Sequence, residues 1–330
     1  MFINLLFLST LISISSNSWM GMWFGLEINL LSIIPLMNNI KNSYSSESSI
    51  KYFIIQALAS SIILMSLIFF IKYNNSYFFN YNNLIIMIFN SSLMMKMGSA
   101  PFHFWMPEIM EGLNWILCFI MFTWQKIIPI IMLNYFFMSY NFIIIIIIFN
   151  LLISGIMGIN QISLRKILTY SSINNISWML SSIMFFQTIW IYYLLIYSMI
   201  LMNLIYFFNK FKIFYLKQLY NFMSKSININ FFILMNFFSL SGIPPFIGFF
   251  PKWLVIQVLI FNKMIFLSMF LILMTLITMY FYTQLMMSTL NFNIYELNFI
   301  KYKLNMNSIF YLNFINLMSL IFCTMIINMN

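Results

Sequence analysis

The sequence predicts an all-α polytopic membrane protein, and three observations support this fold class. Of the 330 residues, 63% are hydrophobic and only 6% are charged, whereas about a quarter of the residues of an average soluble domain are charged. Apolar stretches of roughly 20 residues, the length of a membrane-crossing helix, recur along the chain. The basic residues lie mostly between these stretches, as they do in the loops of membrane proteins.

We expect about eleven transmembrane helices, because backbone groups in lipid must be satisfied within their own segment. In chain order, the expected spans are 3–20, 22–40, 50–72, 80–98, 115–136, 141–160, 167–186, 188–208, 229–258, 265–287 and 307–328. Together they are expected to form a single transmembrane domain over residues 1–330.

The basic residues predict the orientation of the chain. Lys and Arg number 15 against five Asp and Glu, a formal net charge of +10. Ten basic residues fall in loops on the side of the N-terminus, and two, Lys72 and Lys263, fall on the other side. The ten are Lys41, Lys51, Arg165, Lys166, Lys210, Lys212, Lys217, Lys225, Lys301 and Lys303. By the positive-inside rule the N-terminus lies on the cytosol-like side, which is the matrix in a mitochondrion. This distribution indicates membrane orientation rather than nucleic-acid binding.

Residue usage bears on origin and on cofactors. The chain has no Asp, one Arg, two Val and three Ala beside 40 Phe and 31 Met, which favours an AT-rich organellar genome. Cys118 and Cys323 cannot form a disulfide framework or an iron–sulfur site, which needs about four ligands. A single histidine, His103, excludes a multi-His metal site, and no Gly-rich dinucleotide fingerprint is present. We therefore expect any redox cofactor to lie outside this chain.

Two expected spans are interrupted by proline. One interruption is SAPFHFWMP at 99–107 and the other is SGIPPF at 241–246, followed by Pro251 and Lys252. Interrupted helices in corresponding positions of two halves are typical of transporters built from inverted repeats. We expect a first broken helix over about 80–112 and a second over about 229–258. Their separation by five spans gives the two units opposite topology.

Four ionisable residues lie within or beside the apolar spans: Glu27, Lys96, Lys126 and Lys252. A lysine at the centre of a membrane helix costs about 2.5–3.5 kcal/mol, so pairing or access to water is expected. Each lysine could instead snorkel to the headgroups. Glu27 requires a cationic partner or a proton, unless it is a neutral structural residue near a helix end. Burial disfavours a charged ammonium and a nearby carboxylate favours it, so this combination suits a proton relay.

His103 lies inside the first interruption, and two interpretations stay open for it. It could make a structural hydrogen bond to the unwound backbone, or it could take part in a proton relay. Glu108 and Glu111 follow the interruption and are expected at the surface on the side of the N-terminus.

Several motifs resemble the antiporter-like subunits of respiratory complex I. They are KMGSAPFHFWMPE at 96–108, TWQK at 123–126, NQISLRKILTYSSI at 160–173, SLSGIPPF at 239–246 and FFPKW at 249–253. The match runs in the same order from about residue 18 to residue 256. The number of spans also resembles the animal form of one of these subunits.

The resemblance implies roles for these residues. Glu27 matches the family's key glutamate and pairs with Lys96, while Lys126 and Lys252 match its central and terminal lysines. They would form one hydrated polar axis in the middle of the membrane. The family often has a histidine at position 175, where this chain has Asn175, which cannot titrate. A relay step through that position is therefore in doubt, although Asn175 could still orient a water.

The resemblance also implies an assembly. The chain would be a core membrane subunit of an NADH:ubiquinone reductase in the mitochondrial inner membrane, contacting other membrane subunits and lipids, cardiolipin among them. It would bind no cofactor itself, since NADH, FMN, iron–sulfur clusters and ubiquinone belong to other parts of the complex. Two alternatives remain: a stand-alone or Mrp-like cation/proton antiporter, and a structural membrane subunit without its own proton path.

Overall fold

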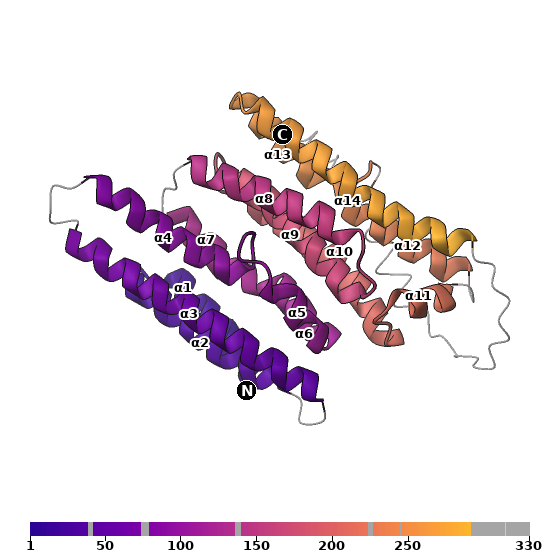
Figure 1. Ribbon diagram of the computed structural model, residues 1–330, viewed down its shortest axis with the longest axis horizontal. Helices are drawn as coiled ribbons and strands as arrows, with labels where there is room; N and C mark the ends of the chain where they lie inside the picture. Colours follow the sequence, from indigo (N-terminus) through magenta and orange to yellow (C-terminus); the bar gives the residue numbers. More distant parts are fainter. Residues whose placement is uncertain are drawn as a thin grey trace. The chain divides into compact units, whose positions relative to one another are not determined.

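A computed structural model describes residues 1–38, 42–73, 79–135, 140–223, 227–244, 246–291 and 314. Within these ranges the secondary structure is helical, apart from an isolated antiparallel bridge between Ser163 and Tyr215 (Figure 1). The all-α class is therefore confirmed. The helices are α1 (Phe2–Ser15), α2 (Trp19–Met37), α3 (Ser43–Tyr73), α4 (Phe79–Met97), α5 (Trp105–Gly112), α6 (Trp115–Phe122), the 3-10 helix η1 (Trp124–Lys126), α7 (Ile127–Tyr135), α8 (Tyr140–Gly158), α9 (Leu164–Ile183), α10 (Ile189–Phe211), α11 (Leu216–Met223), α12 (Ile227–Ser241), α13 (Phe249–Phe261) and α14 (Ile265–Asn291).

The helices form two compact units, Met1–Asn150 and Leu151–Asn330. In the first unit α2 packs between α1 and α3, and α3 also packs against α4 and α5. Figure 1 shows α3 running beside α4, with α5 continuing beyond the interruption. α7 contacts both α1 and α4. The first interrupted helix is thus held by α3 along much of its length.

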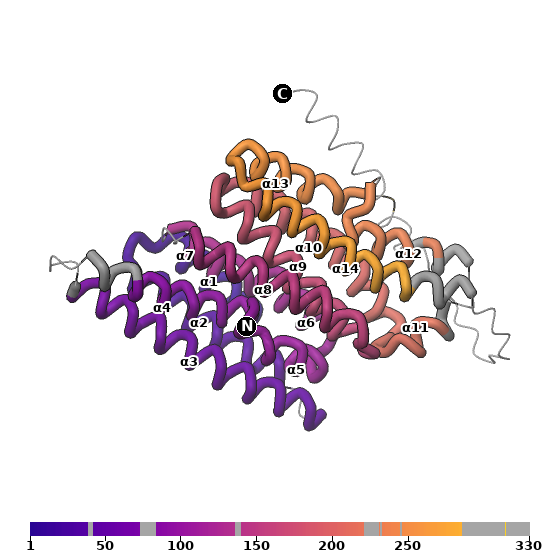
Figure 2. Tube along the Cα trace, turned by 45° about the horizontal axis from the view of Figure 1, so that its top comes forward, coloured from indigo at the N-terminus to yellow at the C-terminus, as the bar shows by residue number. Residues whose placement is uncertain are grey.

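The second unit is built around α9, which contacts α10, α13 and α14. Residues 167–182 of this helix are all buried, although many of them are serine or asparagine. Their hydroxyls are satisfied within the helix: Ser171 donates to the Leu168 carbonyl at 2.8 Å, in the usual pattern of helical serines. Figure 2 shows the traces of α9 and α10 lying along one another. A polar helix can lie at membrane depth because its neighbours cover it.

Six stretches among the described residues are long and apolar enough to cross a membrane, which agrees with a polytopic membrane protein. They are Trp19–Met37, Ser43–Lys72, Trp115–Tyr135, Tyr140–Gly158, Ile189–Phe211 and Ile265–Leu285. Shorter apolar helices occur at Phe2–Ser15, Leu84–Met97 and Phe249–Phe261. The eleventh expected span, 307–328, lies outside the described residues. So do Lys41, Lys225, Pro245, Lys301, Lys303 and Cys323.

Three local features differ from the expected spans. α3 begins at Ser43 rather than at residue 50, so Lys51, counted above among the loop residues, lies on the helix. The expected span 115–136 is divided into α6, η1 and α7. The short helix α11 was not expected, because eight residues with a strongly amphipathic pattern fall below the length of a span.

Candidate functional site

Among the described helices that end at a residue of positive φ, two end at a glycine: α4 at Gly98 and α12 at Gly242. Both glycines have a positive φ, 71° and 77°, in the region that residues with a Cβ adopt only at a cost. The N–H of the residue after each glycine donates to the carbonyl five positions before it, at 3.1 Å in the first case and 3.4 Å in the second. This is the Schellman ending of a helix. The local sequence therefore fixes where both helices stop.

Lys96 lies in the last turn of α4 and is 6% exposed. It lines a small cavity of about 10 Å³, which is space for about one water. Glu27 lies on α2. Both residues belong to the described part of the chain, and they do not form an ion pair within 4.0 Å. The expected pairing of Glu27 with Lys96 therefore stays a prediction.

The same cavity is lined by amide and phenol groups that the sequence interpretation missed. Asn29 and Gln125 donate to each other's side-chain oxygen, both at 3.0 Å. The Tyr52 hydroxyl donates to the same Gln125 oxygen at 3.5 Å, and Gln56 donates to the Lys96 carbonyl at 3.3 Å. All four side chains line the cavity with Lys96. The available signal was the occurrence of amide side chains inside apolar spans, where such groups seek partners on other helices.

Lys126 is the last residue of η1, near the middle of the stretch Trp115–Tyr135, and is 1% exposed. Its backbone N–H donates to the Thr123 carbonyl, three positions earlier, at 3.3 Å. Pro129 adds to this interruption because it has no N–H to donate to the carbonyl four positions before it. A 3-10 turn inside a helix often marks a functional position. Lys126 thus occupies a third helix interruption.

Lys252 lies in the first turn of α13 and is 7% exposed. Its ammonium donates to the Ser241 carbonyl at 2.6 Å, so it satisfies the C-terminal end of α12. The same ammonium lies 5.7 Å from the centre of the Trp178 ring, within cation–π range. The negative end of a helix dipole also favours a cation at this place.

Glycine is required twice around Lys252. A Cβ on Gly242 would lie 2.8 Å from the Lys252 Nζ, so it would displace the ammonium. A Cβ on Gly248 would lie 1.7 Å from the Ser239 carbonyl oxygen, which belongs to the backbone and cannot move easily. The close approach of α13 to α12 therefore depends on Gly248, whereas Gly242 leaves room for the Lys252 side chain.

Asn175 is buried on α9. Its side-chain oxygen accepts a hydrogen bond from the Tyr193 hydroxyl at 2.7 Å. Asn175, Tyr193, Tyr197, Ser239 and Lys252 line a second cavity of about 10 Å³. An amide on α9 and a lysine on α13 thus share one small space.

His103 lies between α4 and α5 and is 2% exposed. Its Nδ1 is 3.3 Å from the Pro101 carbonyl oxygen, and its ring lies 4.3 Å from that of Phe104, centre to centre. In the same segment the Trp105 indole N–H donates to the Met95 carbonyl at 3.2 Å. The indole adds a second donor to the Met95 carbonyl, which also accepts from the Gly98 N–H, whereas the Lys252 ammonium donates to the end of α12.

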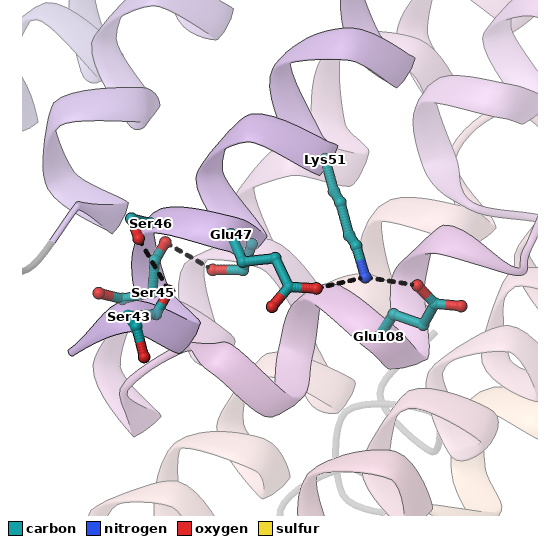
Figure 3. Close-up of polar contacts among 7 residues, drawn as sticks. Ser43, Ser45, Ser46, Glu47, Lys51 and Glu108 are labelled. Atoms are coloured by element: carbon teal, nitrogen blue, oxygen red, sulfur yellow. Dashed lines mark hydrogen bonds and ion pairs between the residues drawn. The ribbon is translucent and has the colours of Figure 1, made fainter.

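The surface end of α5 is tied to α3 by charge (Figure 3). Lys51 lies between two carboxylates, 2.9 Å from Glu47 and 3.0 Å from Glu108. The Lys51 side chain is 42% exposed and that of Glu108 59% exposed, so these ion pairs face solvent. Gly112, at the end of α5, approaches the backbone of Tyr44 so closely that a Cβ would lie 2.5 Å from its carbonyl oxygen.

The candidate residues divide between the two units. Glu27, Lys96, His103 and Lys126 belong to the first unit, and Lys252 belongs to the second. Within the first unit Lys96 shares a cavity with Gln125, the neighbour of Lys126. In the described part of the chain no three His, Cys, Asp or Glu side chains are grouped so as to hold a metal ion.

Comparison with known proteins assigns the family. Residues 16–278 match the family described as NADH:quinone oxidoreductase/Mrp antiporter, TM. NADH-ubiquinone oxidoreductase chain 2 of Anopheles gambiae is 45% identical over 308 residues, which cover 93% of this chain and 90% of that protein. The protein of the same name from Aedes aegypti is 46% identical over 335 residues, covering 98% and 96%.

Solved structures support the fold. A chain of respiratory complex I from Thermus thermophilus with bound aureothin has a TM-score of 0.82 at 18% identity, covering 96% of this chain and 77% of its own length. A chain of the Mrp complex from a Dietzia species has a TM-score of 0.72 at 15% identity, covering 86% and 59%. Because the family match covers most of the sequence and both insect relatives align over nearly all of it, the chain belongs to the NADH:quinone oxidoreductase/Mrp antiporter transmembrane family.

Proposed function

We propose that this chain is a core membrane subunit of respiratory complex I and that it translocates protons through an intramembrane relay of Glu27, Lys96, Lys126 and Lys252. The names of the relatives from mosquitoes support the assignment to the complex. In this proposal the protein is multi-pass in the mitochondrial inner membrane, with its N-terminus on the matrix side. Proton transfer is driven by electron transfer from NADH to ubiquinone in other subunits.

One observation carries the relay: the three buried lysines all lie at interruptions of helices. Lys96 lies in the last turn before the first break, Lys126 in a 3-10 turn, and Lys252 in the first turn after the second break. Each is at most 7% exposed. Helix interruptions leave backbone groups and water near a buried charge, which a proton path needs. A purely structural subunit would gain nothing from three such costly charges.

The proposed architecture is a single antiporter-like domain over residues 1–330, with eleven transmembrane helices and two broken helices in inverted repeats. The use of glycine at the ends of α4 and α12 supports the repeat, because α10 and α13 make the same kind of ending with lysines, Lys212 and Lys263. The fold shared with antiporter complexes supports it as well.

In this proposal the chain itself carries no redox centre. NADH, FMN, the iron–sulfur clusters and ubiquinone belong to other parts of the complex. Its partners are other membrane subunits and lipids, cardiolipin among them, and not nucleic acid. His103 is a candidate member of the relay, and its contact with the Pro101 carbonyl equally suits a structural role.

Replacing Lys126 with Met tests the relay. Methionine fills a similar volume without charge, so the complex is expected to assemble and to pump fewer protons for each NADH oxidised. Phe119→Met, a neutral change elsewhere on the same span, is the matched control. Proton uptake and NADH oxidation are measured together in sealed vesicles. Unchanged protons per NADH in Lys126→Met would remove this lysine from the relay.

A native gel of mild-detergent membranes tests the assignment to the complex separately. The chain is expected to migrate with the large band that oxidises NADH. Migration in a small band without this activity would favour a stand-alone antiporter.

A further inference from the structure

The backbone just after α4 makes a hydrogen bond to a side chain from a helix that follows much later in the chain. The N–H groups of Gly98 and Ser99 donate to carbonyls of α4 itself. The next N–H, that of Ala100, donates instead to the side-chain oxygen of Asn150 on α8. Pro101 follows and has no N–H to donate. Asn150 therefore accepts the last backbone N–H before the proline.

Asn150 uses only half of its amide group, although it lies in an apolar helix. Its exposed fraction is 0%, and α8 is long and apolar enough to cross a membrane. Among the described residues its Nδ2, which carries two hydrogens, has no hydrogen-bond partner. A buried amide with one group unpaired adds little net stability. Its contribution is direction, because the oxygen can accept only when the Ala100 N–H faces α8.

A second amide holds the same helix end from another helix. Gln56, on α3, donates to the Lys96 carbonyl at 3.3 Å and is 5% exposed. The two bonds have opposite polarity, since Gln56 supplies a donor and Asn150 supplies an acceptor. They attach backbone positions four residues apart, with Gly98 and its positive φ between them. The end of α4 is thus held at Lys96 by α3 and at Ala100 by α8.

We propose that Asn150 is a positioning residue, which fixes the backbone of the first interruption against α8 and, together with Gln56, sets the place of Lys96. Without the Asn150 oxygen the Ala100 N–H is buried without an acceptor, so the chain after Gly98 turns towards another one. The last turn of α4 moves with it, because Lys96 is only four positions away. The effect on proton transfer rests on the proposed function, whereas the bond between Asn150 and Ala100 does not.

The first test is Asn150→Leu, which removes the acceptor oxygen and keeps a side chain of similar size. Asn90→Leu is the matched control: Asn90 is 1% exposed on α4, and neither polar atom of its side chain has a partner among the described residues. Protons pumped per NADH oxidised are measured in sealed vesicles and taken per assembled complex. Asn150→Leu is expected to pump fewer protons than wild type, with a loss no larger than that in Lys96→Met. Asn90→Leu is expected to pump as wild type.

The second test, Asn150→Asp, separates the oxygen from the rest of the side chain. Aspartate has the shape of asparagine and keeps an oxygen for the Ala100 N–H, whether its carboxyl group is charged or protonated. It is expected to restore most of the proton pumping that Asn150→Leu loses. Pumping as low in Asn150→Asp as in Asn150→Leu would overturn the proposal. An equal loss in Asn150→Leu and Asn90→Leu would overturn it as well.

Density maps of the assembled complex separate this proposal from the proposed function. In wild type the Asn150 side-chain oxygen should lie within about 3.2 Å of the Ala100 nitrogen, and a side chain turned away would overturn the proposal even where Asn150→Leu does not assemble. Normal pumping in Asn150→Leu beside impaired pumping in Lys96→Met would overturn the positioning role. Normal pumping in both would reject the relay through Lys96, and the map of Asn150→Leu would then decide. A displaced backbone at 98–101 supports the positioning role, and an unchanged one overturns it.

Discussion

The ends of α4 and α12 have the same backbone conformation and differ in the side chain that donates to a carbonyl of the last turn. Both helices end at a glycine with positive φ and a bond spanning five residues. After α4 the last turn is satisfied by a neutral donor, the Trp105 indole, at the Met95 carbonyl. After α12 the donor is the Lys252 ammonium, at the Ser241 carbonyl. The same fold element is therefore held once by a neutral group and once by a charge.

Lys96 and Lys252 therefore lie in different environments. In the first unit the Trp105 indole donates to the backbone, and the Lys96 side chain lies beside a cavity lined by amide groups. Lys252 is tied to a backbone carbonyl, and Trp178 covers its ammonium. A charged Lys252 stabilises the end of α12, so in the proposed relay the protonation state of Lys252 is coupled to the stability of this helix end.

The largest expected effect comes from comparing Lys252→Met with Lys96→Met. Each change removes a buried charge and its desolvation cost. Lys252→Met also leaves the Ser241 carbonyl without its donor, which costs about 1–3 kcal/mol for a buried group. We therefore expect Lys252→Met to lower the stability of the complex by about this amount relative to Lys96→Met. The measurement is the temperature at which half of the assembled band is lost on native gels.

Both variants should pump fewer protons per NADH when the ratio is taken per assembled complex. Equal thermal stability of the two variants would show that the Ser241 carbonyl finds another donor. The contrast between a charged and a neutral helix end would then have no energetic meaning.

The second expected effect concerns Trp105→Phe. The change keeps a large aromatic ring and removes one of two N–H donors to the Met95 carbonyl, which also accepts from the Gly98 N–H at 3.2 Å. A neutral hydrogen bond contributes about 0.5–1.5 kcal/mol net, so the loss of stability should be of this order. Because the last turn of α4 carries Lys96, proton pumping should fall as well.

Trp23→Phe is the matched control for this change. The Trp23 indole donates to the Ser60 carbonyl at 3.1 Å in the same unit, between α2 and α3 rather than at the interruption. A similar loss of stability with unchanged pumping is expected. Equal proton pumping in Trp105→Phe and Trp23→Phe would show that the hydrogen bond at the end of α4 does not affect the function of Lys96.

The positions of the interruptions could be predicted from the sequence, whereas their partners could not. Proline and glycine act on their own backbone, so the ends near Gly98 and Gly242 follow from local rules. The donor at each end comes from the next helix, and only packing decides whether Trp105 or Lys252 reaches it. Pro129 was a local sequence signal for the 3-10 turn at Lys126. It was missed because the expected spans were assigned by their length and apolar composition.

The buried polar partners of the lysines could not be predicted from the sequence either, because they come from other helices. Asn29, Gln56 and Gln125 are far apart in the sequence and meet only when α2, α3 and η1 pack together. Asn175 was expected to affect a relay through the loss of a titratable group. Its bond to Tyr193 depends on the rotation of α10 against α9, which composition does not determine.

The smallest expected effect is at the surface, where Lys51 joins the start of α3 to α5 beyond the first interruption. Lys51→Gln removes both ion pairs, and Lys72→Gln, at the other end of the same helix, is the control. Exposed ion pairs contribute little, and salt screens what remains. Thermal stability of the complex should therefore change only slightly, and the difference from wild type should vanish in high salt. A large, salt-independent loss would mean that the position of α5, and with it the first interruption, depends on this charge, which would make the first helix end as dependent on a lysine as the second.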